Sequence, residues 1–111
     1  MTNQEVFDKV VTALRKQGAK SQSHGCCAYR GRWGRKCAVG HLIPDELYDE
    51  NMEGKLWVDL SEWFPAVDNL QLNRNLVQEL QLIHDDHRVR DWEDYWRDLA
   101  YRYNLTYTPS E

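Results

Sequence analysis

The stretch that decides the fold class spans residues 70–86 and reads LQLNRNLVQELQLIHDD. Its apolar residues recur every three or four positions, together with one histidine: Leu72, Leu76, Val77, Leu80, Ile83 and His84. Four polar residues lie off this face: Gln71, Arg74, Gln78 and Gln81. This spacing predicts an amphipathic helix over 70–86 with one buried face.

Two further segments share this period. Residues 3–17 place Val6, Phe7, Val10, Val11 and Leu14 on one stripe. Thr2 and Glu5 form a capping box before it, and Gly18 suits the left-handed position after it. A third helix is expected to begin at Asp91 and to bury Trp92, Trp96, Leu99 and Tyr103. Asn104 should end that helix, with Leu105 folding back onto it.

The segment between the first two helices carries turn signals instead. Residues 26–30 and 35–39 flank the turn Gly31-Arg32-Trp33-Gly34, a pattern that indicates a β-hairpin. Pro44 with the two acids after it should start a short helix. Residues 51–58 are expected to form a loop with a short extended piece, and residues 61–64 at most one helical turn, ended by Pro65.

The chain is therefore expected to be a mainly α domain with one small β-hairpin, compact and single over residues 1–111, with a frayed tail at 106–111. A chain of 111 residues can bury one core but not two. We expect that core to centre on Tyr29, Cys37, Leu42, Leu80, His84 and Trp96.

Composition and charge constrain where the protein works. Because no apolar run approaches ~20 residues, we expect no membrane span. The polar start MTNQEVFDKV predicts no signal peptide, and three cysteines favour free thiols in a reducing, cytoplasmic compartment. Residues 1–40 carry eight basic and two acidic side chains, whereas residues 41–111 carry sixteen acids against six bases. Such asymmetry concerns partners and solubility rather than fold.

The region from Cys26 to Tyr48 contains Cys27-Ala28-Tyr29-Arg30, then Lys36-Cys37-Ala38-Val39-Gly40, then Leu42-Ile43-Pro44-Asp45-Glu46-Leu47-Tyr48. In these motifs the chain resembles a family of small bacteriophage and bacterial proteins with no assigned function. The resemblance extends over nearly the whole chain. It implies a phage-type accessory protein acting inside a host cell. The basic turn and His41 depart from the family pattern, so a role for Arg32, Arg35 or His41 would be particular to this protein.

Two chemical hypotheses involve the cysteines and histidines. Cys27, Cys37, His41 and His84 are zinc-ligand types, although their spacing is not that of a zinc ribbon. Cys27 or Cys37 could instead act as a nucleophile with His84 and Asp85. Adjacent helical residues point ~100° apart, however, so His84 and Asp85 should diverge. The sequence leans against an enzyme.

Two binding hypotheses remain, and the first of these is favoured. Trp, Tyr and Arg dominate interface hot spots, which favours a non-catalytic protein that binds and modulates or inhibits a host protein. The candidate contacts are Arg30, Arg32, Trp33 and Arg35 at the hairpin tip, and Asp94 and Asp98 on the last helix. Alternatively, the basic segment 30–36 could bind nucleic acid, with arginines on phosphates and Trp33 stacked on a base. The many aromatic residues also allow a homodimer.

Overall fold

The computed structural model describes residues 1–23 and 26–110 and is mainly helical. The longer helices are α1 (Asn3–Gln17), α5 (Arg74–Asp86) and α6 (Trp92–Arg102). The shorter ones are α2 (Ala38–Leu42), α3 (Trp57–Trp63) and α4 (Pro65–Asp68). Single 3₁₀ turns lie at Arg32–Gly34, Asp45–Leu47, Glu50–Met52 and Val89–Asp91. In the described ranges, no helix is both long and apolar enough to cross a membrane.

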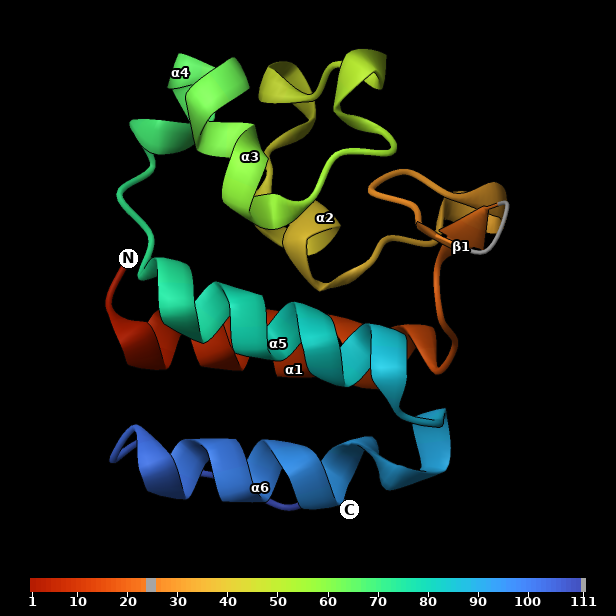
Figure 1. Cartoon of the computed structure of the whole chain (residues 1–111). Coiled ribbons are helices and arrows are strands. Elements are labelled where there is room, and N and C mark those ends of the chain that lie inside the picture. Colours follow the sequence, from red (N-terminus) through yellow and green to blue (C-terminus); the bar gives the residue numbers. More distant parts are fainter. Residues whose placement is uncertain (24–25, 111) are drawn as a thin grey trace.

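Helix α5 occupies the centre of the molecule. It packs against α1, α2, α3 and α6, and Figure 1 shows α6 on one side of it and the short helices α2 to α4 on the other. Helix α1 runs alongside α5. The residues expected at the core are all buried: Tyr29, Cys37, Leu42, Leu80, His84 and Trp96.

The three long helices confirm the predicted helices, although Leu72 precedes α5, Tyr103 follows α6, and both are only half-buried. Thr2 Oγ1 accepts the Glu5 N–H at 3.1 Å, and Glu5 Oε1 accepts the Thr2 N–H at 2.8 Å, which completes the capping box of α1. Gly18 follows with φ +63°. Helix α5 starts at Arg74 rather than near residue 70, because the Asn73 side chain caps it.

The end of α6 also follows the prediction. Asn104 adopts φ +56°, and its N–H donates to the Tyr101 carbonyl at 3.2 Å. The Leu105 N–H donates to the Ala100 carbonyl at 2.8 Å, which completes a Schellman motif. The described part of the expected frayed tail is instead held on α1, since Gln4 hydrogen-bonds both backbone groups of Thr106 and Arg15 donates to the Thr108 carbonyl. Glu111, the last residue of that prediction, lies outside the described residues.

The predicted β-hairpin is not supported, because residues 32–34 form a 3₁₀ turn and Ala38–Leu42 form a helix. The described strands are two residues long: β1 (Gln22–Ser23) pairs antiparallel with β2 (Cys26–Cys27). Side chains from distant elements cause the difference. Gln81 Oε1 of α5 accepts the Val39 N–H at 2.9 Å at the start of α2, and Arg30 donates to the Gly40 and Ile43 carbonyls at its end.

Gly40 permits this arrangement. A Cβ on Gly40 would lie 2.4 Å from the Tyr29 carbonyl oxygen, so only glycine lets α2 approach the loop so closely. The middle of the chain is also more helical than expected. Helix α3 begins at Trp57 inside the predicted loop, where the Trp57 indole donates to the Arg74 carbonyl at 3.0 Å, and Pro65 begins α4.

Candidate functional site

Trp33 is the most unusual side chain of the loop between β2 and α2. It is 80% exposed and adopts φ +57° and ψ +31°, the left-handed region that a bulky residue rarely occupies. Two backbone hydrogen bonds close the loop around it, from the Gly31 N–H to the Arg35 carbonyl (2.7 Å) and from the Cys37 N–H to the Ala28 carbonyl (3.2 Å). The fold therefore holds an indole in solvent at a conformational cost.

Two hollows flank this indole. One of about 340 Å³ lies between Trp33 and residues 20–23, and one of about 440 Å³ lies between Trp33 and the end of α1. Trp33 and Arg35 line both hollows, so they form the ridge between them. The Arg35 guanidinium carbon lies 4.9 Å from the Trp33 ring centroid, within cation–π range.

The charge around the ridge has a single sign. The charged side chains that line the hollows are all basic: Lys16, Lys20, Arg32 and Arg35. Among residues 1–23 and 26–110, no acidic side chain lines either hollow. We call Trp33 and these four bases the Trp33 surface. It concentrates positive potential although the chain carries a net charge of −4.

Arg30, a sequence-predicted contact residue, serves the loop instead. Its guanidinium donates to the Tyr29, Gly40 and Ile43 carbonyls and pairs with Asp45 at 2.9 Å. Glu53 also holds this segment, since its carboxylate accepts the Tyr29 and Arg30 N–H groups, each at 3.0 Å. The base of the loop is thus fixed.

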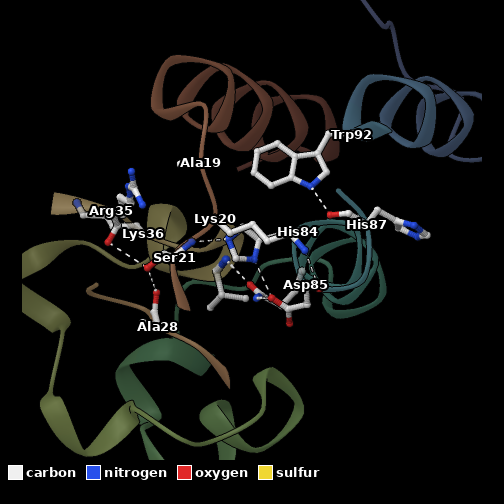
Figure 2. A network of polar contacts seen from close by, with 12 residues as sticks. Ala19, Lys20, Ser21, Ala28, Arg35, Lys36, His84, Asp85, His87 and Trp92 are labelled. Atoms are coloured by element: carbon white, nitrogen blue, oxygen red, sulfur yellow. Dashed lines mark hydrogen bonds and ion pairs between the residues drawn. The ribbon is translucent and has the colours of Figure 1, made fainter. Parts of the chain in front are cut away.

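His84 ties the loop to α5, as Figure 2 shows. It is fully buried, and its Nε2 accepts the Ser21 N–H at 3.0 Å. Nδ1 therefore carries the proton and donates to Asp85 Oδ1 at 2.7 Å. The Ser21 hydroxyl in turn donates to the Ala28 carbonyl at 2.7 Å. This chain of contacts runs from α5 through Ser21, which directly precedes β1, to the loop that carries Trp33.

This arrangement differs from the predicted nucleophile site. The prediction that the His84 and Asp85 side chains diverge is wrong. The Asp85 carboxylate lies along its own helix, where it accepts hydrogen bonds from His84 Nδ1 and from the Gln81 amide, the latter at 2.9 Å. Yet Nε2, the atom that would activate a thiol, is occupied by the Ser21 backbone. The His84–Asp85 pair instead holds the segment at Ser21 in place.

The predicted zinc ligands are divided among separate contacts. His41 Nε2 lies 3.1 Å from Gln17 Oε1, and both nitrogens of His84 are bonded as described above. Burial, with Lys36 as the next cause, lowers the pKa of His41 to about 4. In the described part of the chain, no three His, Cys, Asp or Glu side chains are grouped so as to hold a metal ion.

Cys27 and Cys37 do lie together. Cys27 is half-buried and Cys37 is fully buried, and the two side chains are neighbours. The neighbouring Cys37 side chain lowers the pKa of Cys27, whereas burial raises the pKa of Cys37 well above its usual value. Cys26, the third cysteine, lies in β2.

The acidic contacts predicted on the last helix face neighbouring arginines. Asp94 pairs with Arg97 at 3.1 Å and Asp98 with Arg102 at 3.5 Å, all on the exposed side of α6. These pairs reduce the negative potential that α6 could offer a partner. Asp94 and Asp98 are thus less distinctive than the basic residues around Trp33.

Sequence reasoning identified Arg32, Trp33 and Arg35 but missed Lys16 and Lys20. Lys16 lies on the polar side of α1 and Lys20 in the following loop, and only the positive charge of residues 1–40 hinted at either. In comparisons with known proteins, no family model, no curated protein and no solved structure matches the chain. The site therefore has to be interpreted from its own chemistry.

Proposed function

We propose that this protein is a non-catalytic binding protein that engages a single-stranded nucleic acid of its host cell through the Trp33 surface. One observation carries the proposal: an indole that is 80% exposed, held in a strained backbone, stands between two hollows whose charged residues are all basic. Backbone strain of this kind is concentrated at functional sites.

The two parts of the surface match the two parts of a nucleotide strand. An exposed indole offers a stacking face that every base can use, and each stacked base contributes ~1–3 kcal/mol. Arginine and lysine side chains bind phosphate oxygens. Basic side chains line both hollows. The two phosphates that flank a nucleobase stacked on Trp33 would therefore each lie over a positively charged hollow.

The rest of the molecule limits the size of the footprint. Residues 41–111 carry sixteen acids against six bases, so an extended duplex would be repelled beyond the ridge. A short unpaired segment avoids that repulsion. Each of the four basic side chains of the Trp33 surface can neutralise one phosphate. A plot of the logarithm of the association constant against the logarithm of salt concentration should then have a slope of about −3.

A second candidate partner is a host protein. Binding to a host protein is the function that the sequence favours. Leu56, which directly precedes α3, and Trp63, at its end, are 68% and 66% exposed, and Val58 is also exposed. Exposed apolar residues of this kind are typical of protein interfaces. The resemblance to small phage proteins agrees with either partner, because both belong to the host.

The decisive experiment compares matched variants in a fluorescence anisotropy titration with a labelled oligothymidylate. The double variant Arg32→Ala with Trp33→Ala should bind at least about tenfold more weakly, because it loses a stack and a phosphate contact. Asp94→Asn with Asp98→Asn serves as the control and should bind at least as tightly as the wild type. Equal binding by the Arg32/Trp33 double variant and the wild type would remove the proposed site.

Affinity capture from a bacterial lysate, with and without nuclease, separates the two partner classes. Recovery of nucleic acid that depends on Trp33 supports the proposal. A stoichiometric protein that survives nuclease and is lost on Trp63→Ala would favour the protein partner instead.

A further inference from the structure

Cys27 and Cys37 bracket the loop that carries the Trp33 surface. Cys27 ends β2 and Cys37 directly precedes α2. The Cys37 N–H donates to the carbonyl of Ala28, the neighbour of Cys27, so the two backbone segments are already joined at the base of the loop. The two side chains are themselves neighbours, because each cysteine affects the pKa of the other. A disulfide would need little movement of the backbone.

The two thiols differ in access. Cys27 lines a surface hollow of about 280 Å³ together with Lys55, Leu56, Asp85 and others. Cys37 has no exposed surface. A small oxidant can therefore reach Cys27 first, with Cys37 behind it as the only described thiol in contact.

The residues that line the hollow restrict the oxidant. Asp85 and Asp86 both face it, and the Lys55 ammonium is turned to the Asn51 carbonyl at 2.6 Å. An anionic oxidant would be repelled by the two carboxylates. A small neutral molecule such as hydrogen peroxide suits both the size and the charge of the entrance.

We propose that Cys27 and Cys37 form a peroxide-reactive dithiol, in which Cys27 is the attacking thiol and Cys37 the resolving thiol. The access of Cys27 to solvent sets this order of roles, and the neighbouring Cys37 lowers the pKa of Cys27, which favours the reactive thiolate.

The chemistry proceeds in two steps. The Cys27 thiolate attacks one peroxide oxygen, so that an S–O bond forms, the O–O bond breaks, and hydroxide leaves and becomes water on protonation. Cys27 is oxidised to the sulfenic acid and the peroxide is reduced. The Cys37 sulfur then attacks the Cys27 sulfur, the S–S bond forms as the S–O bond breaks, and the departing oxygen takes the Cys37 proton as water.

The disulfide would close a loop over the nine residues 28–36, which include Arg32, Trp33 and Arg35. This consequence rests on the proposed function: oxidation would fasten the binding loop at its base and keep the Trp33 surface in shape. The oxidised protein should bind oligothymidylate at least as tightly as the reduced protein.

The test treats the full-length protein with hydrogen peroxide, blocks the remaining thiols with N-ethylmaleimide, and maps disulfides after tryptic digestion without reductant. We expect near-complete linkage of fragments 21–30 and 37–55 through Cys27, both in the wild type and in the matched control Cys26→Ser. Cys37→Ser should form no disulfide and should accumulate a Cys27 sulfenic acid, which dimedone traps. Fragment spectra distinguish Cys26 from Cys27.

The proposal would be overturned by a disulfide that links Cys26 to Cys37. It would also be overturned if the thiols of the native wild type stay reduced in peroxide but oxidise once the protein is unfolded in urea. The wild-type map needs no variant to fold and no binding partner. A mapped Cys27–Cys37 disulfide without oligonucleotide binding in either redox state would refute the proposed function and leave the dithiol standing.

Discussion

Replacing His84 with alanine should destabilise the protein by about 3–6 kcal/mol. The variant leaves the buried Ser21 N–H without its acceptor, which costs ~1–3 kcal/mol. It also empties a fully buried ring site beside Trp92, whose ring centroid lies 5.6 Å away, and a cavity of that kind costs a further ~2–3 kcal/mol. Such a loss is a large fraction of the stability of a small domain.

Urea unfolding followed by circular dichroism measures the change, and two further variants isolate its cause. Glutamine can place an oxygen where Nε2 stands, so His84→Gln should recover part of the loss by accepting the Ser21 N–H. Asparagine is too short, so His84→Asn should not. His87→Ala is the control, because the His87 ring stacks only on the half-exposed Tyr95 and its loss should cost under about 1 kcal/mol.

Two results would refute this reasoning. A cost below about 1 kcal/mol for His84→Ala would mean that the ring is not packed as described. Equal stabilities for His84→Gln and His84→Asn would show that the hydrogen bond to Ser21 contributes little.

Three other perturbations have definite expected outcomes. Trp33→Gly should leave the free energy of unfolding unchanged or raise it by up to about 1 kcal/mol, since glycine adopts φ +57° without strain, while oligonucleotide binding falls; a clear loss of stability in thermal melts would contradict this. Gly40→Ala should cost more than about 2 kcal/mol in urea unfolding, because its Cβ would meet the Tyr29 carbonyl at 2.4 Å; a neutral variant would show that α2 can shift. The pKa of His41 is lowered to about 4, so between pH 6.5 and 4 the unfolded state binds the proton and the folded state does not. Stability should therefore fall as pH drops through that window, by about 1 kcal/mol for this partly exposed ring, and His41→Gln should flatten this part of the pH profile; an unchanged profile would refute the assignment.

The parts of the fold that local sequence determines were predicted well. The capping box at Thr2 and the left-handed Asn104 are set by residues within one helical turn. The loop between β2 and α2 was not predicted correctly, because Gln81 and Arg30 cap α2 from elsewhere in the chain. No local pattern contains that information.

The candidate site divides in the same way. Arg32, Trp33 and Arg35 are close in sequence and could be proposed together. Lys16 and Lys20 join them only because the fold brings the end of α1 beside the loop. Arg30 looked equivalent to its neighbours, yet three backbone carbonyls and Asp45 hold it inward.

The most direct measurement is an NMR titration of the five tryptophan indole N–H signals with a short oligothymidylate. We expect the Trp33 signal to shift progressively, the buried Trp92 and Trp96 signals to stay in place, and added salt to reverse the shift. A Trp33 signal that remains fixed at saturating oligonucleotide, or a shift confined to Trp63, would contradict it.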